Sequence, residues 1–244
     1  MTANLEVTTS TYGPGAKSID IYRPTPAGPA PVVLLWHGIG PDERDVLAPL
    51  AEATARQGLL VYVPDWRPDA EDGGRGHLLE SLRFVREHAA SHGGDADRTV
   101  LAGWSAGASA AVSLALAPEA VDGWRPTAAV GIAGRYDRPS RITGTSPTAE
   151  LSRPALAPSP VWLVHGTSDA LVSSRYSEEF RDALRDHGWS AHLETPASDH
   201  AGVIMTEYDP DQNRCRPAQA EHARSAGLTT AGILATAAST TVGR

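Results

Sequence analysis

Short apolar runs alternate along the chain with longer segments in which apolar residues recur every three or four positions. Short apolar runs bounded by Gly, Pro and polar residues are typical of buried strands, and the periodic segments are typical of amphipathic helices. The expected strands cover residues 5–9, 18–23, 32–36, 59–63, 99–102, 128–133, 161–164 and 191–195. The expected helices cover residues 44–57, 76–91, a segment ending at 117, 174–188 and 217–238.

The order of these elements predicts the architecture. The first two strands alternate in character and predict an antiparallel hairpin at an edge of the sheet. From residue 32 onward strands and helices alternate, which is typical of a parallel sheet with helices on both faces. We therefore expect an α/β fold with a mostly parallel central sheet. A single domain over residues 1–244 is expected, because α/β folds of this length commonly share one core.

The pentapeptide at 103–107 reads G-W-S-A-G and matches the G-x-S-x-G pattern of a nucleophile elbow. The pattern alone is a weak signal in a chain rich in Gly and Ser, but here it follows an apolar run and precedes small residues suited to opening a helix. Between a strand and a helix the turn is sharp enough to strain the serine and expose its hydroxyl at the sheet edge. Ser105 is therefore the predicted nucleophile.

A serine nucleophile needs a base, and the base needs an acid to orient it. Asp169 follows the strand at 161–164, and His200 follows the strand at 191–195. Loops that follow parallel strands open at the same edge of a sheet, so Ser105, Asp169 and His200 can meet there. Asp137, which follows the strand at 128–133, is the alternative acid.

The strand at 32–36 ends in a loop that reads H-G-I-G at 37–40. Its glycines let the backbone turn and present N–H groups to a developing oxyanion. The predicted donors are the N–H groups of Ile39 and Ala106, with Gly38 as an alternate for the first. His37 is expected to brace this loop rather than to contact substrate.

Three aromatic residues near the same edge are predicted to line the substrate pocket. Trp104 adjoins the nucleophile, Trp66 lies in the loop after the strand at 59–63, and Tyr136 follows the strand at 128–133. Packing of Trp66 on the body of the protein is the alternative. The polar segment 201–216 is expected to fold back over the entrance. Residues 135–160 lack an amphipathic helix, so no large cap is expected.

On these residues the chain resembles the α/β-hydrolases over nearly its whole length, and it is similar to their small carboxylesterase, dienelactone-hydrolase-like and kynurenine-formamidase-like branches. The matching segments are 37–40, the elbow at Ser105, 165–169 and His200. The resemblance implies a serine hydrolase that cleaves a small or medium carboxylic ester through an acyl-enzyme, without a cofactor. An aryl formamide is the next substrate class, and a silent homologue that binds a small ligand is the alternative of another class. Dienelactone hydrolases use Cys where this chain has Ser105, so their activity is not expected.

Composition and charge limit the classes of binding partner that we expect. The net charge is −8 and no basic cluster is present, which argues against nucleic acid or an anionic membrane as a partner. Neither a signal peptide nor a membrane span is visible, so a cytoplasmic enzyme with a small-molecule ester or amide substrate is expected. Cys215 is the only cysteine, which excludes an internal disulfide, and its role is expected to be incidental. Pairs such as 192 and 194 are too weak a signal for a metal site, and none is expected.

Overall fold

Eight strands form one sheet in a computed structural model that describes residues 5–25, 29–152 and 159–240. The sheet has the order β1-β2-β4-β3-β5-β6-β7-β8, and β9 and β10 form a separate hairpin. The strand bounds are β1 Leu5–Tyr12, β2 Lys17–Pro24, β3 Ala30–Trp36, β4 Leu60–Pro64, β5 Gly94–Trp104, β6 Ala128–Ile132, β7 Val161–Val164, β8 Ala191–Glu194, β9 Thr206–Asp209 and β10 Arg214–Pro217.

The pairing of the strands agrees with the predicted topology. Strand β1 pairs antiparallel with β2, and β2 pairs antiparallel with β4. Every other neighbouring pair in the sheet, from β4 across to β8, is parallel. The central strands β3 and β4 are buried on both faces, which explains why they read as continuous apolar runs rather than alternating ones. The carboxyl ends of the parallel strands therefore share one edge.

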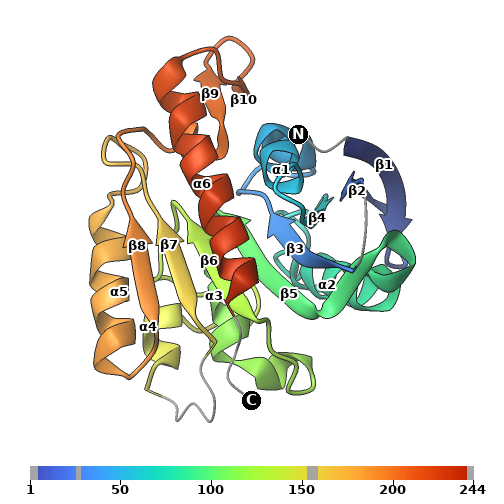
Figure 1. Ribbon diagram of the computed structural model, residues 1–244. Helices are drawn as coiled ribbons and strands as arrows, with labels where there is room; N and C mark the ends of the chain where they lie inside the picture. Colours follow the sequence, from blue (N-terminus) through green and yellow to red (C-terminus); the bar gives the residue numbers. More distant parts are fainter. Residues whose placement is uncertain (1–4, 26–28, 153–158, 241–244) are drawn as a thin grey trace.

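Helices cover both faces of the sheet. Side chains of α1 and α6 pack on one face in one hydrophobic cluster, whereas those of α2, α3 and α5 pack on the other. Figure 1 shows α6 running in front of the sheet. The helix bounds are α1 Ala48–Ala55, α2 Arg75–His88, α3 Ala106–Leu116, α4 Pro147–Glu150, α5 Arg175–Asp186 and α6 Glu221–Ser239. The described residues also form four short 3-10 helices, at Arg44–Leu47, Ala90–His92, Pro118–Val121 and Gly202–Ile204.

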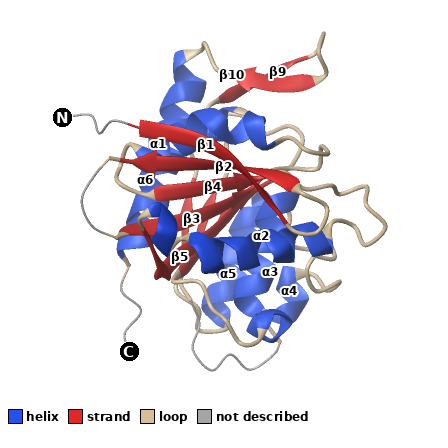
Figure 2. Cartoon of the chain, turned by 90° about the vertical axis from the view of Figure 1, so that its right-hand side faces the viewer, coloured by secondary structure: helices blue, strands red, loops and turns tan. Residues whose placement is uncertain are grey.

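The segment 201–216, predicted only as a long polar loop, contains a 3-10 turn and most of the β9–β10 hairpin. Figure 2 shows this hairpin standing apart from the main sheet. The hairpin turn includes Asn213 in the left-handed region at φ 48°, a conformation that Asn tolerates better than most residues. Its strands are short and mostly polar, so they carry no periodic apolar signal that a sequence pattern could detect.

The segment 135–160 contains no helical cap in its described part. Its one α-helix there is α4, which is four residues long, and residues 153–158 lie outside the described residues. Within the described chain, no helix has the length and apolar character that crossing a bilayer requires.

Candidate active site

Ser105 lies in the strained turn between β5 and α3 that the pentapeptide predicts. Its backbone has φ 55° and ψ −115°, a region that residues with a side chain rarely adopt. A Cβ at Gly103 would lie 2.2 Å from the backbone of Gly107, and a Cβ at Gly107 would lie 2.5 Å from carbonyl oxygens of Trp36 and His37. Only glycine fits at both positions, so the turn can close tightly enough to expose the serine.

The structure brings His200 to Asp169, in a pair shaped for acid–base work. His200 Nδ1 donates to Asp169 Oδ2 over 2.6 Å. The other carboxylate oxygen accepts two backbone N–H groups, from Leu171 at 2.9 Å and Val172 at 2.8 Å. The Asp169 side chain is fully buried, and the His200 side chain is 10% exposed. This bond holds His200 in the tautomer that leaves Nε2 able to accept a proton.

A second histidine, His165, holds the same carboxylate. Its Nε2 lies 3.2 Å from Asp169 Oδ2 and 2.8 Å from the Val172 carbonyl oxygen, while its Nδ1 lies 2.7 Å from the Ser177 hydroxyl. His165 is fully buried. In the sequence, His165 is marked only as the first residue of the matching segment 165–169. The signal that could have found it is its i, i+4 spacing to the predicted acid.

Burial and hydrogen bonding act in opposite directions on the pKa of Asp169. Burial by itself raises the pKa, but the hydrogen bonds from His165, His200 and the Val172 N–H bring it well below its usual range. Asp169 therefore stays ionised, as an acid that stabilises a charged imidazolium must.

Asp137, the alternative acid, lies elsewhere. Its carboxylate accepts hydrogen bonds from Arg135 Nε at 2.7 Å and Nη2 at 3.1 Å, and the side chain is exposed. The Arg135 hydrogen bond lowers the pKa of Asp137. Of the two candidate acids, only Asp169 contacts His200 among the described residues.

His37, the first residue of the loop at 37–40, is fully buried and its ring holds the loop through hydrogen bonds. Burial lowers the pKa of His37 to about 3, so the ring is neutral near neutral pH. Its Nε2 accepts the backbone N–H groups of Trp66 at 3.1 Å and Glu43 at 3.3 Å, which leaves Nδ1–H to donate to the Gly38 carbonyl oxygen at 3.1 Å. In a trans peptide the N–H points opposite to the C=O. The Ile39 N–H is thus turned away from His37.

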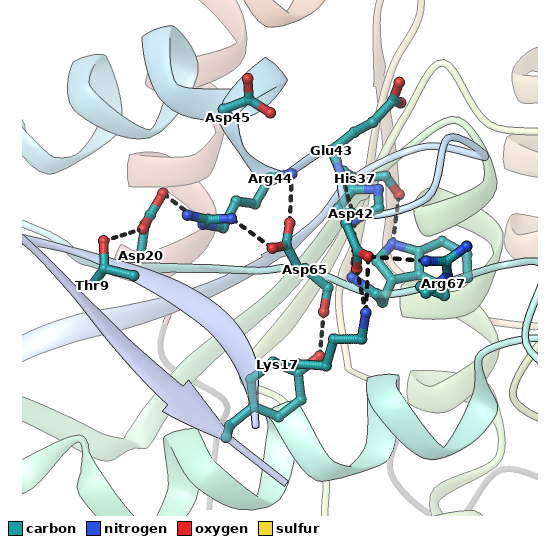
Figure 3. A network of polar contacts seen from close by, with 12 residues as sticks. Thr9, Lys17, Asp20, His37, Asp42, Glu43, Arg44, Asp45, Asp65 and Arg67 are labelled. Atoms are coloured by element: carbon teal, nitrogen blue, oxygen red, sulfur yellow. Dashed lines mark hydrogen bonds and ion pairs between the residues drawn. The ribbon is translucent and has the colours of Figure 1, made fainter. Parts of the chain in front are cut away.

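Ion pairs around this loop tie it to the sheet, as Figure 3 shows. Arg44 pairs with Asp65 at 2.5 Å and with Asp20 of β2 at 3.0 Å. Lys17, at the start of β2, pairs with Asp42 at 2.6 Å. Partly buried charges with several partners hold their geometry better than exposed pairs do. The network joins the segments after β3 and β4 to the neighbouring strand β2.

Ser105 and His200 open on one cavity of about 740 Å³, here called the main cavity. Its apolar wall includes Ile39, Val46, Trp104, Leu171 and Val172. The β9–β10 hairpin and its turn add a second wall, as the sequence predicted for segment 201–216, with lining residues Tyr208, Asn213, Arg214 and Cys215. Burial raises the pKa of the Cys215 thiol.

Of the three aromatic residues predicted to line the substrate pocket, one lies at the main cavity. Trp104 lines the main cavity, and its Nε1–H donates to the His200 carbonyl oxygen at 2.9 Å. Trp66 is instead fully buried beside His37, with Nε1–H donating to the His37 carbonyl oxygen at 3.2 Å. Tyr136 is buried and stacks on Phe180 at 4.3 Å between ring centres. Both are core residues, Trp66 in the hydrophobic cluster that includes α2 side chains and Tyr136 in the cluster that includes α5 side chains.

No metal centre is formed by the described part of the chain, where three or more His, Cys, Asp and Glu side chains nowhere gather as a ligand group.

Solved structures of similar shape identify the fold. A provisionally named dienelactone hydrolase from Klebsiella pneumoniae subsp. pneumoniae has a TM-score of 0.72 at 22% identity, with 97% of this chain and all of that chain covered. Carboxyl esterase 2 from Tuber melanosporum has a TM-score of 0.69 at 16% identity, with 97% of this chain and 87% of that chain covered. The chain has the α/β-hydrolase fold. A bacterial heroin esterase also superposes on this chain, with a TM-score of 0.69 at 18% identity, covering 98% of this chain and 86% of that chain.

Curated relatives of this chain are named as esterases. A probable isoprenylcysteine alpha-carbonyl methylesterase of Oryza sativa subsp. japonica is 30% identical over 223 residues, which is 72% of this chain and 52% of that protein. Esterase LipQ of Mycobacterium tuberculosis is 27% identical over 236 residues, which is 78% of this chain and 56% of that protein. The chain spans about half the length of these relatives. No family model matches it.

Proposed function

We propose that this α/β-hydrolase cleaves small carboxylic esters through a covalent acyl-enzyme on Ser105. The observation that carries the proposal is the bond between His200 and the buried, ionised Asp169, on the wall of the cavity that Ser105 also lines. A histidine held in this way is the base that a serine nucleophile needs. The esterase names of the relatives favour an ester over an amide as substrate.

The reaction proceeds in two displacements. His200 Nε2 takes the proton of the Ser105 hydroxyl while Ser105 Oγ attacks the ester carbonyl carbon. The carbonyl oxygen becomes an oxyanion that accepts hydrogen bonds from the N–H groups of Ile39 and Ala106, with Gly38 N–H as the alternate. The imidazolium then protonates the departing alkoxide oxygen. Water repeats the attack on the acyl-enzyme, with His200 again as base, and releases the carboxylic acid.

The positions of both donors support this role. The Ile39 N–H is turned away from His37 because the Gly38 carbonyl is bonded to that ring. Ala106 is the first residue of α3, where N–H groups have no partner within the helix and carry the positive end of its dipole. An oxyanion between them would have two fixed donors and would not need the loop to reorganise.

The test compares Ser105→Ala with the wild-type protein on p-nitrophenyl acetate. We expect a burst of p-nitrophenol from the wild type, and a loss of about 10³- to 10⁶-fold in kcat for a folded Ser105→Ala protein. A fluorophosphonate should add mass to the peptide that contains Ser105. A Ser105→Ala protein that keeps more than a tenth of the activity would exclude Ser105 as the nucleophile. Ser109→Ala, which changes a nearby hydroxyl on α3, is the control for labelling.

A further inference from the structure

A second and smaller cavity opens on the other side of Ser105 and carries arginines. It holds about 190 Å³ and is lined by Ser105, Ala106 and Ser109 at the start of α3, by Ala133, and by Val172. The remaining wall is formed by Pro139 and three arginines, Arg135, Arg138 and Arg141. We call this the arginine cavity. His200 does not line it.

The charge of this cavity contrasts with that of the whole chain. The chain has 29 acidic residues against 21 Lys and Arg, yet three arginines gather here at every third position after β6. Arg135 is paired with Asp137 through two hydrogen bonds. Among the described residues, neither Arg138 nor Arg141 forms an ion pair with a carboxylate. The Arg141 guanidinium donates to the Pro68 carbonyl oxygen at 3.3 Å and has further N–H groups to offer.

The loop that carries the arginines is anchored on both sides of them. Tyr136 is buried against Phe180, and its carbonyl oxygen accepts the Thr148 N–H at 3.1 Å. Ile142 is buried, its N–H donates to the Ser140 hydroxyl at 3.1 Å, and its carbonyl oxygen accepts Arg75 Nε–H at 2.8 Å. The backbone that presents the guanidinium groups is therefore held in place before a ligand arrives, which lowers the entropic cost of binding.

The chemistry at Ser105 decides which part of a substrate enters this cavity. His200 must protonate the leaving alkoxide, so the alcohol side of the ester has to lie in the main cavity, which His200 lines. The acyl side then points into the arginine cavity. Guanidinium groups beside a helix N-terminus favour a carboxylate. Water in the liquid occupies about 30 Å³ per molecule, so the cavity takes an acyl chain of about six heavy atoms.

We propose that the arginine cavity selects esters whose short acyl chain ends in a free carboxylate, that is, half-esters of dicarboxylic acids of about four carbons. For monomethyl succinate the reaction is half-ester plus water to succinate plus methanol, with the steps described for Ser105 above. This inference rests on the proposed function for its chemistry. The charge-selective binding that it predicts can be measured without turnover.

The test compares monomethyl succinate with methyl 4-methylpentanoate, which has the same leaving group and a neutral group of similar shape in place of the carboxylate. We expect a kcat/KM ratio in favour of the anionic ester of about 10- to 100-fold, the worth of hydrogen bonds to charged groups. Arg141→Gln and Arg138→Gln should each reduce this ratio, and the double variant should bring it near or below one. The preference should weaken as ionic strength rises.

Two control variants distinguish an effect of the arginine cavity from an effect of losing any positive charge. Arg56→Gln removes an exposed arginine at the end of α1 and should leave the ratio unchanged. Arg214→Gln removes an arginine from the wall of the main cavity and should also leave the ratio unchanged. A loss of selectivity in Arg214→Gln that equals the loss in Arg141→Gln would overturn the proposal. A preference of equal size for 3-acetoxypropionate over a neutral acetate ester would do the same, because that anion lies on the alcohol side.

Binding without turnover distinguishes this proposal from the proposed function. Ser105→Ala protein is titrated calorimetrically with monomethyl succinate and with methyl 4-methylpentanoate. Selective binding of the anion, lost in the Ser105→Ala, Arg141→Gln double variant, supports the site even if no ester is hydrolysed. Hydrolysis of p-nitrophenyl acetate together with equal kcat/KM values for the two methyl esters would leave the esterase standing and exclude the carboxylate site.

Discussion

The two cavities that meet at Ser105 differ in how they are built. The main cavity draws its walls from the loops after β3, β7 and β8 and from the β9–β10 hairpin, and its lining is largely apolar with Glu43 and Asp199 among its polar residues. The arginine cavity is about a quarter as large and takes its charge from one short stretch of chain. Ser105 thus faces a largely apolar cavity on the side of His200 and a cationic cavity on the other side, so under the proposed function the two ends of an ester would have different surroundings.

The two candidate acids contact residues that line different cavities. Substituting them gives the largest expected effect on kcat. Asp169 is hydrogen-bonded to His200, whereas Asp137 pairs with Arg135 at the arginine cavity. Asp169→Asn should lower kcat by about 10⁴, because an amide favours the wrong imidazole tautomer. Asp137→Asn should cost far less. Rates on p-nitrophenyl acetate, with melting temperatures of both variants to show that they fold, check this. Equal losses would place the acid after β6 instead.

The loop at 37–40, which lines the main cavity, gives the next largest effect. His37→Ala removes the donor to the Gly38 carbonyl and so frees the Ile39 N–H to turn, although the His37 side chain itself lines neither cavity. Loss of one oxyanion donor costs about 10²- to 10³-fold in kcat, and we expect a loss near the lower figure with little change in KM. Because the pKa of His37 is about 3, the wild-type rate should show no step from this ring between pH 5 and 8. A raised KM with an unchanged kcat would contradict a positioning role.

The difference in volume between the cavities predicts the smallest effect. The length of the acyl chain should be limited, whereas the length of the alcohol should not. Lengthening the acyl chain from acetyl to octanoyl should lower kcat/KM by at least about tenfold, since an octanoyl chain exceeds what about 190 Å³ holds and even one misfitting methylene costs about that much in a hydrophobic pocket. Lengthening the alcohol from methyl to hexyl should be tolerated in the main cavity.

Rates on long-chain esters taken through the solubility limit complete this last prediction. With no helical cap in the described part of residues 135–160, we expect simple saturation across that limit. A sharp rise in rate at the limit would show that a lid exists. A drop caused by the alcohol chain, and not by the acyl chain, would reverse the assignment of the two cavities.

The sequence determined those parts of the molecule whose causes are local. Apolar runs predicted the central strands of the main sheet, because a strand buried on both faces must be apolar along its length, whereas an alternating pattern predicted the β1–β2 hairpin. The G-W-S-A-G turn was readable because a backbone that brings Gly103 to within a Cβ contact of Gly107 excludes other residues. The placement of Asp169 and His200 followed from the shared edge of parallel strands.

Tertiary structure decided what depends on contacts between distant segments. It placed Trp66 and Tyr136 in the core. The sequence does not show whether a tryptophan or tyrosine in a loop packs against the core or faces a cavity. It turned His165 onto the carboxylate of Asp169 and joined the β9–β10 hairpin to the wall of the main cavity. It also brought three loop arginines to the far side of Ser105. Their spacing is visible in the sequence, but their direction is set by the buried Tyr136 and Ile142 on either side.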